Sequence, residues 1–454
     1  MRREELRVLL VVCFGTFFHI QSVGSISVSL PAIQKEFDTT LAAVQWIGLM
    51  GAIMLSSLSL CFGRAGDLLG RKTIFKIGLS LYTAGAALAA LAGSFPQLLA
   101  SRCVMALGLA MAAPLAAAII ASAQSSGSRG QALGLLAASV ALGRTTGPTI
   151  GGFILHVWGW RAVFLANCIF GVATCLILFS ILRGPEERRK APFDFLGGLS
   201  LVIGFPSLLI ALTVGTRMGW DASQIILWLG FAAAGLITFV WRELHAPAPL
   251  MNLHHFRSIP LVRSMLSLVL ATLAFYPVTI FGPLYLLNVI GASPLSSGLA
   301  MATLPLCTTL LSPLSGRLAD RFNPRWVAIL GLCIILVGVF FYARLGAESS
   351  VTWIVSVLSI LGAGIGLFIP ANEKTAFSTV PSRDYGMVSA MVTAFGTGSG
   401  ALGTTIAVAL TEMSKKSRMS ADAAGFVYDQ QFAFLSLLPL AAGALIIMMV
   451  GKRD

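Results

Sequence analysis

Two arginines and a glutamate interrupt long apolar stretches of the chain: Arg102, Arg144 and Glu373. A charge in such a stretch costs several kcal/mol in hydrocarbon unless it faces a cavity or a partner, so both arginines are candidate functional residues. Arg102 lies near the start of its stretch, so its side chain could instead extend to the outer surface. We expect Glu373 to be an interface residue that forms a local ion pair with Lys374. These residue types predict recognition of charged or polar small molecules.

Patterns typical of enzymes are absent from the sequence, which contains no HExxH, no GxSxG and no paired carboxylates within one apolar stretch. The seven cysteines lie within apolar stretches and form no CxxC pair, so we expect packing residues and neither disulfides nor zinc. His245, His254 and His255 have no acidic or thiol ligand at metal-binding spacing and are interpreted as solvated loop residues. We therefore expect no enzyme, no cofactor and no metal site.

A charged segment is repeated in the two halves of the chain. GRAGDLLGRK occupies residues 63–72 and GRLADRFNPR occupies residues 316–325. Both copies begin with Gly-Arg and place an aspartate, Asp67 or Asp320, four residues after the first glycine. This repetition predicts two related helical bundles, each with a short loop that holds and releases a neighbour. The second copy lacks the second glycine, so we expect it to hold more weakly.

A glycine-rich segment, GRTTGPTIGG, spaces Gly143, Gly147 and Gly151 four residues apart. On a helix this spacing gives one face without side chains, which a neighbouring helix can approach closely. Pro148 removes a backbone donor on that face and favours a bend. The segment is either a tight helix pair or a bending point between two bundles, and both interpretations can hold together.

The composition predicts an all-α integral membrane protein, because 57% of residues are hydrophobic, only 11% are charged and the mean hydropathy is +0.87. Apolar stretches of spanning length fall in a six, two and six arrangement, about 14 spans in all. The first stretch, Leu6 to Leu30, is too long for a signal peptide and is expected to be retained. The predicted division is residues 1–182 for an N-terminal six-helix bundle, 183–259 for two additional helices and 260–454 for a C-terminal six-helix bundle.

The net charge of +13 is explained by topology. With the N-terminus in the cytoplasm, 22 of the 31 Lys and Arg residues fall in loops on that side. This asymmetry predicts that both termini are cytoplasmic, and it argues against nucleic acid as a partner.

The repeated segment and the glycine-rich segment together resemble two motifs of the major facilitator superfamily, in the order and context that this family shows. Further matching segments are LPAI at 30–33, WGWRAVFLAN at 158–167 and GASPLSSGLAMATLP at 291–305. With the six, two and six layout, the chain is similar to the fourteen-span drug:proton antiporter branch. The resemblance implies the major facilitator fold, in which two six-helix bundles rock around a central cavity.

The resemblance also implies roles for particular residues. Asp67 would accept hydrogen bonds at a helix N-terminus or from an arginine, and thereby favour the outward-open state. Arg71 and Lys72 would lie near lipid headgroups. The latch residues are Gly63, Asp67, Gly70, Arg71, Lys72, Gly316, Asp320 and Arg321. The antiporter motif comprises Gly143, Gly147, Pro148, Gly151 and Gly152.

One family feature is missing. The family carries an aspartate in the first span, and this chain has Ser22 at that position. His19 lies on roughly the same helix face and could titrate instead, or His19 and Gln21 could simply form hydrogen bonds to the substrate or to the backbone. An N-terminal bundle with two arginines and no acid favours anionic or zwitterionic cargo. The candidate substrate and proton residues are His19, Gln21, Ser22, Trp46, Arg102, Arg144, Tyr276, Tyr285, Asn288 and Glu373.

The sequence therefore predicts a secondary transporter that exports a small amphipathic molecule by alternating access, against protons. A first alternative is an exporter of an organic anion, siderophore or lipid with different or no proton coupling. A second is a membrane sensor on a transporter scaffold, which the absence of an appended soluble domain disfavours. We expect a multi-pass protein of the inner or plasma membrane, a monomer, whose partners are a small-molecule substrate, protons and membrane lipids.

Overall fold

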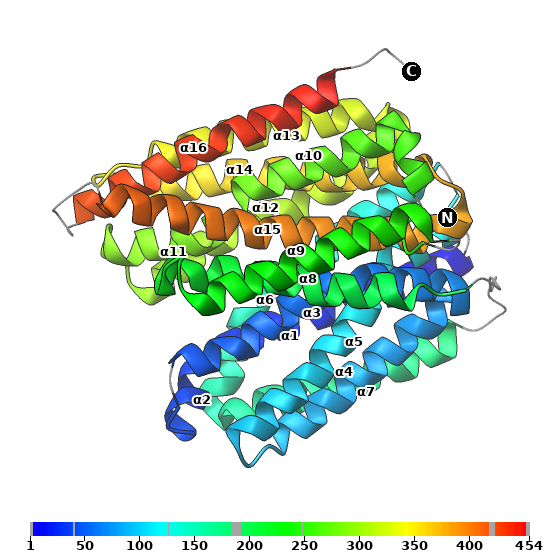
Figure 1. The fold of residues 1–454 in the computed structure, drawn as a ribbon, viewed down its shortest axis with the longest axis horizontal. Coiled ribbons are helices and arrows are strands. Elements are labelled where there is room, and N and C mark those ends of the chain that lie inside the picture. The colour runs from blue at the N-terminus through cyan, green and yellow to red at the C-terminus, as the bar shows by residue number, and fades with distance from the viewer. Residues whose placement is uncertain are drawn as a thin grey trace.

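The computed structural model describes residues 3–39, 41–125, 127–182, 192–246, 249–251, 253–416 and 423–450. These residues form helices and connecting turns and contain no β-strand (Figure 1). The helices of the first half are α1 (Arg3–Ser27), α2 (Leu30–Glu36), α3 (Leu41–Leu69), α4 (Arg71–Ala90), α5 (Phe95–Ala123), α6 (Arg129–Trp158) and α7 (Trp160–Ile181). The helices that follow are α8 (Phe195–Met218), α9 (Ser223–His245), η1 (Leu253–Arg257), α10 (Ile259–Phe275), α11 (Val278–Asn288), α12 (Pro294–Arg321), α13 (Pro324–Ala343), α14 (Val351–Ser378), η2 (Ser382–Asp384), α15 (Tyr385–Lys416) and α16 (Ala423–Met449).

The long helices form two groups that lie side by side. In Figure 1 α1–α7 occupy the lower half of the molecule and α10–α16 the upper half. Four helix pairs make most of the contact between the groups: α3 with α15, α5 with α15, α6 with α12 and α6 with α14. The start of α1 and the end of α16 lie at the same end of the molecule, on the right in Figure 1. The arrangement confirms an all-α fold with two helical bundles.

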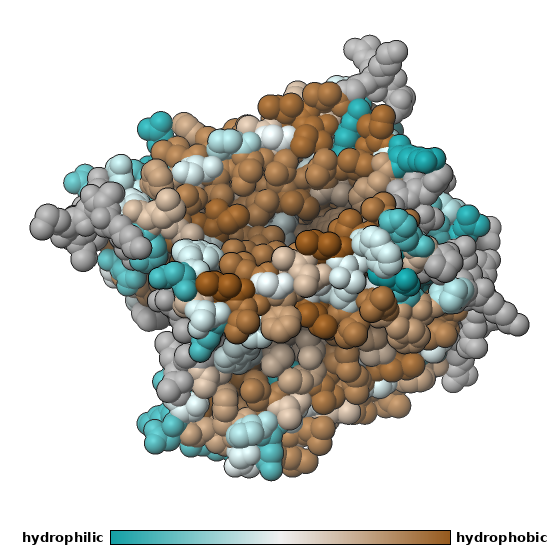
Figure 2. Space-filling model, viewed as in Figure 1, coloured by the Kyte–Doolittle hydropathy of each residue, from teal (hydrophilic) through white to brown (hydrophobic). Residues whose placement is uncertain are grey.

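Helix length and hydropathy fit a protein that crosses a membrane many times. Thirteen stretches of the described residues are long and apolar enough to span, with residues 259–288 counted as one. The helix α6, which has 30 residues and packs between α1 and α12, is not among these thirteen, so the count of about 14 spans stays a prediction. Figure 2 shows hydrophobic residues over the middle of the visible face and hydrophilic residues at its two ends. That distribution suits a hydrocarbon layer around the middle.

The charged motif was expected to be a loop, and the structure places most of it in a helix. Residues 63–69 continue α3, and only Gly70, with φ of 109°, separates α3 from α4. A positive φ of this size favours glycine, because a Cβ clashes there. The second copy behaves in the same way, since α12 continues through Arg321 before a short turn. The aspartates are therefore held on rigid helix ends.

The apolar stretch 260–287 forms two helices. The first, α10, ends at Phe275, and α11 begins at Val278. Pro277 lies between them, and proline removes a backbone donor and favours such an interruption. The ring of Tyr276 at this break lies against Gly400 of α15.

The two additional helices, α8 and α9, pair with each other and pack across the junction of the bundles. Gly198 of α8 approaches the Sγ atom of Cys61 on α3, and the ring of Phe205 contacts Gly398 on α15. An ion pair of 2.8 Å between Arg242 and Asp194 ties the end of α9 to the start of α8. The pair α8–α9 thus covers the α3–α15 junction. The basic segment 183–191 before it lies outside the described residues.

Candidate functional site

Asp67 joins the two bundles at the end of α3. Its side chain is buried, and its two oxygen atoms accept hydrogen bonds of 2.9 Å from the backbone N–H groups of Gly386 and Met387. These are the first N–H groups of α15, which have no partner within their own helix and carry the positive end of its dipole. The Nε atom of Arg71 donates to Asp67 at 2.7 Å, while its Nη2 atom donates to the Ser382 carbonyl at 2.6 Å. We call this set of contacts the first latch.

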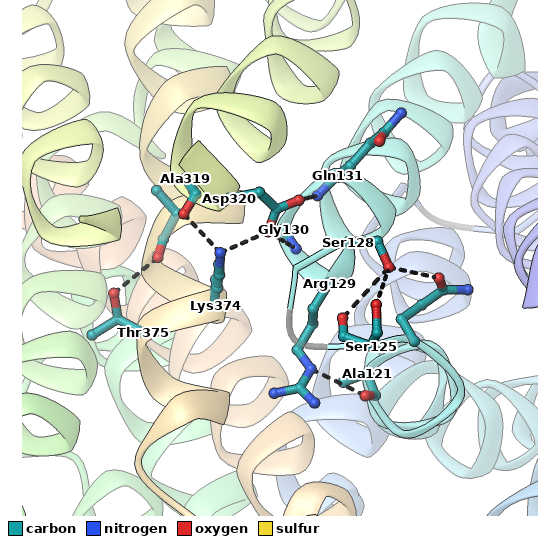
Figure 3. Close-up of polar contacts among 12 residues, drawn as sticks. Ala121, Ser125, Ser128, Arg129, Gly130, Gln131, Ala319, Asp320, Lys374 and Thr375 are labelled. Atoms are coloured by element: carbon teal, nitrogen blue, oxygen red, sulfur yellow. Dashed lines mark hydrogen bonds and ion pairs between the residues drawn. The ribbon is translucent and has the colours of Figure 1, made fainter. Parts of the chain in front are cut away.

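Asp320 forms a matching set at the end of α12, which we call the second latch. Its two oxygen atoms accept hydrogen bonds of 2.8 Å from the N–H groups of Gly130 and Gln131 at the start of α6. Figure 3 shows Asp320 between these N–H groups and the ammonium group of Lys374, which lies 2.6 Å from its Oδ1 atom. Lys374 also donates to the carbonyl of Ala319.

These contacts correct two expectations and leave a third as a prediction. The second copy was expected to hold more weakly; it forms the same kinds of contact as the first, two helix N-terminal donors and an ion pair, and its relative strength stays a prediction. Arg321 was assigned to the latch, but it is exposed and takes no part in this network. Lys374 was expected to pair with Glu373, but it pairs with Asp320. The sequence signal for Lys374 was its basic side chain in an otherwise apolar stretch.

Close helix contacts accompany both latches. A Cβ atom on Gly63 would lie 2.3 Å from the Cβ of Ala390, and one on Gly316 would lie 2.1 Å from the carbonyl oxygen of Gly130. Real Cβ atoms do not approach other atoms so closely. The glycines therefore allow the two bundles to meet at this end of the molecule, which we call the latch end. Lys72 is half-buried at the start of α4.

A cavity of about 420 Å³ lies between the bundles. Its lining comes from α1, α3, α5 and α6 on one side and mainly from α10, α12, α14 and α15 on the other. Most lining side chains are apolar, such as Leu136, Phe275 and Ile369, with threonine hydroxyl groups between them. The volume is in the range of small-molecule sites in proteins.

Among the described residues that line this cavity, Arg144 is the basic residue and Glu373 is the acidic one. Arg144 comes from α6 and Glu373 from α14, so each bundle contributes one charge. Neither side chain forms an ion pair with a described residue. Glu373 was expected at an interface, and the structure instead places it on the cavity wall. An apolar cavity with one charge of each sign can hold an amphipathic molecule.

Several candidate residues of the first half lie inside the N-terminal bundle and do not line the cavity. His19, Gln21 and Ser22 of α1 are buried, and Gln21 donates to the Oγ atom of Ser25 at 2.8 Å. Arg102 is 5% exposed, which excludes the interpretation that it extends to the outer surface. Its Nε and Nη2 atoms donate to the carbonyl of Ile47.

The other aromatic and amide candidates also divide into residues that line the cavity and residues that do not. Tyr276 lines the cavity beside the break between α10 and α11. Trp46 is exposed on α3 and lies outside the lining. Tyr285 is fully buried in the second bundle and donates to the Gly346 carbonyl, while Asn288 is exposed at the end of α11. The predicted cavity roles of Trp46, Tyr285 and Asn288 are therefore corrected.

The glycine face of α6 packs against α1 within one bundle. Cβ atoms on Gly143, Gly147 and Gly151 would lie 2.3 to 2.7 Å from backbone atoms of α1. Pro148 lies on the same face, against Gly24, whereas Gly152 has open space around it. The glycine face is therefore a tight helix pair and does not lie between the bundles. Contact between the bundles uses the α12 side of α6.

Two of the three histidines interpreted as solvated loop residues, His245 and His255, have partners in the folded chain. The Nε2 atom of His255 lies 2.9 Å from a carboxylate oxygen of Asp384, and the Nδ1 atom of His245 lies 2.9 Å from the Trp241 carbonyl. The described residues contain no cluster of His, Cys, Asp and Glu suited to a metal ion. The seven cysteines, all described, are free thiols.

Several curated relatives of this chain are named for drug resistance. It is 30% identical over 414 residues to the multidrug resistance protein Stp of Mycobacterium tuberculosis, covering 90% of this chain and 76% of Stp. It is 26% identical to the lincomycin resistance protein LmrB of Listeria monocytogenes, covering 92% and 89% of the two chains. It is 27% identical to the tetracenomycin C resistance and export protein of Streptomyces glaucescens, covering 89% and 76%.

Solved structures and a family profile agree on the fold. The human organic anion transporter MFSD10 superposes with a TM-score of 0.70 at 16% identity, covering 98% of this chain and 100% of that one. The proton:xylose symporter XylE superposes with a TM-score of 0.68 at 15% identity, covering 98% and 95%. The Major Facilitator Superfamily profile matches residues 12–404 and 264–453. With two latched bundles around a central cavity, the chain belongs to the Major Facilitator Superfamily and is a multi-pass membrane transporter of small molecules.

Proposed function

We propose that this protein exports a small amphipathic molecule in exchange for protons, with Glu373 as the proton-carrying residue. The observation that carries the proposal is the cavity between the bundles, apolar except for Arg144 and Glu373 and closed by two latches at one end. The names of the relatives, which include multidrug resistance proteins, support a drug-like cargo.

The proposed orientation places the latch end in the cytoplasm. The basic residues near this end, such as Arg64, Arg71 and Arg317, support this placement through the positive-inside rule. The latched form is then closed to the cytoplasm, and cargo enters after both latches open. The three-part division is also a proposal, supported by the way α8 and α9 pair with each other outside the two bundles.

Glu373 suits the proton role because it is the acidic residue of the cavity and has no ion pair among the described residues. A carboxylate in that position changes the net charge of the cavity when it gains or loses a proton. Binding of a proton and binding of a cationic cargo group are therefore mutually exclusive at this residue, which is the linkage that antiport requires. His19 does not reach the cavity, so it is a poorer candidate.

The test is transport by purified protein in proteoliposomes with an imposed pH gradient. Three probes cover the charge classes: ethidium as a lipophilic cation, ciprofloxacin as a zwitterion and fluorescein as an organic anion. We expect the gradient to drive accumulation of the first two. Glu373→Gln is expected to lose this accumulation by about tenfold or more while still exchanging labelled for unlabelled probe, because a charge-assisted interaction contributes about 1.5–3 kcal/mol.

Glu348→Gln is the matched control, since Glu348 is exposed in the loop after α13. Gradient-driven accumulation that persists in Glu373→Gln would contradict the proton role. Accumulation without any gradient would contradict antiport itself.

A second candidate function, export of an organic anion, is favoured by Arg144 on the cavity wall. In that case fluorescein would be the best of the three probes, and Arg144→Gln would lose its transport. Loss of ciprofloxacin transport with ethidium transport intact in Arg144→Gln would instead favour a zwitterionic cargo.

A further inference from the structure

A polar cluster lies inside the N-terminal bundle, away from the cavity. Four side chains form it: His19 and Ser22 of α1, Tyr82 of α4 and Arg102 of α5. The rings of His19 and Tyr82 have centroids 4.2 Å apart, and the hydroxyl groups of Tyr82 and Ser22 share a hydrogen bond. Tyr82 also interacts electrostatically with Arg102. All four residues are 5% exposed or less. None of them lines the cavity.

The guanidinium group of Arg102 has no acidic partner in this cluster. Its contacts are to the carbonyl of Ile47, at 3.2 and 3.3 Å, to the sulfur of Met105, at 3.4 Å, and to the hydroxyl group of Tyr82. The neighbouring groups from α1, α3 and α4 are an imidazole, two hydroxyl groups and a carbonyl, none of which carries negative charge at neutral pH. A buried charge in a membrane protein pairs with an opposite charge or with backbone carbonyls, and Arg102 has the carbonyl of Ile47 but no negative charge beside it.

His19 gives an independent indication of a ligand. Both of its ring nitrogens are buried, and neither has a hydrogen-bond partner among the described residues. Buried polar atoms in native proteins almost always have a partner. The Ser22 hydroxyl donates to the His19 carbonyl and shares a hydrogen bond with the Tyr82 hydroxyl, so the N–H groups of His19 and Arg102 are the donors that a ligand could meet here.

We propose that this cluster is a binding site for a compact monovalent anion, either a halide such as chloride or a small carboxylate group. Arg102 supplies the charge and N–H donors, and the His19 ring supplies a further N–H donor beside the hydroxyl pair of Ser22 and Tyr82. The anion completes the charge balance of the N-terminal bundle and stabilises the contacts among α1, α4 and α5. The site is separate from the cavity that holds Arg144 and Glu373, so its occupancy does not depend on the identity of the cargo.

The experiment is thermal unfolding of the cargo-free purified protein in detergent, with sodium isethionate as the background salt at constant ionic strength. Chloride, bromide and acetate are titrated separately. Since a ligand that binds only the folded state raises the melting temperature with its concentration, we expect a saturable rise of a few degrees with chloride or bromide. A response to acetate as well assigns the site to carboxylate groups in addition to halides.

Two variants in the cluster test its assignment. Ser22→Asp places a fixed carboxylate in the cluster, so its melting temperature should no longer respond to halide. Arg102→Gln removes the charge and should also abolish the response. Because the two variants test the same site, one folded variant is enough for the test. Arg144→Gln is the matched control and should retain the full response, because that arginine belongs to the cavity.

Three results would overturn the proposal. They are a wild-type protein with no anion-specific response, a folded Ser22→Asp or Arg102→Gln variant with an unchanged response, and loss of the response in Arg144→Gln. None of these measurements involves transport, so they are independent of the proposed export function.

Discussion

The first and second latches form the same kind of contact with different helices. They differ in the residue that supplies the positive charge. In both, an aspartate accepts two hydrogen bonds from the N-terminus of a helix in the opposite bundle. Arg71 follows Asp67 by four residues, so the first pair is fixed by the local sequence. Lys374 comes from α14, 54 residues from Asp320, so the second pair is fixed by packing alone.

The position of Lys374 connects the second latch to the cavity. Glu373, the preceding residue, lies on the cavity wall, whereas Arg71 has no such neighbour. The first latch has a different attachment, because α8 covers the α3–α15 junction. If Glu373 carries the proton as proposed, we expect a proton or cargo there to act most directly on the second latch.

The largest expected effect is loss of either aspartate. Asp67→Asn and Asp320→Asn should each weaken the closed latch end by about 3 kcal/mol, roughly a hundredfold, because an amide keeps the shape but loses the charge-assisted hydrogen bonds. Hydrogen–deuterium exchange should show faster exchange at Gly386 and Met387 in the first variant and at Gly130 and Gln131 in the second. A clearly smaller effect of Asp320→Asn than of Asp67→Asn would support the expectation that the second latch holds more weakly.

Alanine at the latch glycines should have the next largest effect. Gly63→Ala and Gly316→Ala place a methyl group against Ala390 or the Gly130 backbone, and overpacking of this kind costs about 1–3 kcal/mol. Transport should fall and exchange at the latch end should rise. Gly152→Ala, where nothing lies within 4 Å, is the control and should retain wild-type transport.

Removal of the positive partners should distinguish the two latches by the pH dependence of transport. Arg71→Gln and Lys374→Gln each leave the two backbone hydrogen bonds in place, so the loss should be about 1 kcal/mol at these partly exposed pairs. Only Lys374→Gln is expected to change the pH dependence of transport, because its neighbour is Glu373. Equal pH profiles for the two variants would disprove a special link between the second latch and the cavity.

The smallest effect is expected at Arg321. Arg321→Gln should change transport and stability by less than about 0.5 kcal/mol, as is usual for an exposed residue without specific contacts. Transport initial rates in the same proteoliposomes check this. A loss as large as that of Lys374→Gln would show that the motif position matters more than the observed contacts.

Much of the fold could be predicted because hydrophobic runs of spanning length must form helices in lipid. The candidate site was harder, as Glu373 and Lys374 illustrate. Neighbouring residues on a helix point about 100° apart, so one faces the cavity and the other faces Asp320. A linear sequence places them together as a local pair. Likewise, Arg102 and Arg144 look alike in sequence, yet one is enclosed in a bundle and the other lines the cavity.

The sequence by itself determined the membrane-spanning helices, the repeated aspartate motif and the glycine spacing of α6, because each depends on residues close together in the chain. The tertiary structure alone decided which helix N-terminus each aspartate meets, that Lys374 replaces Arg321, and that the cavity takes one charge from each bundle. Those features depend on the rotation and packing of helices from distant parts of the chain, which local sequence does not specify.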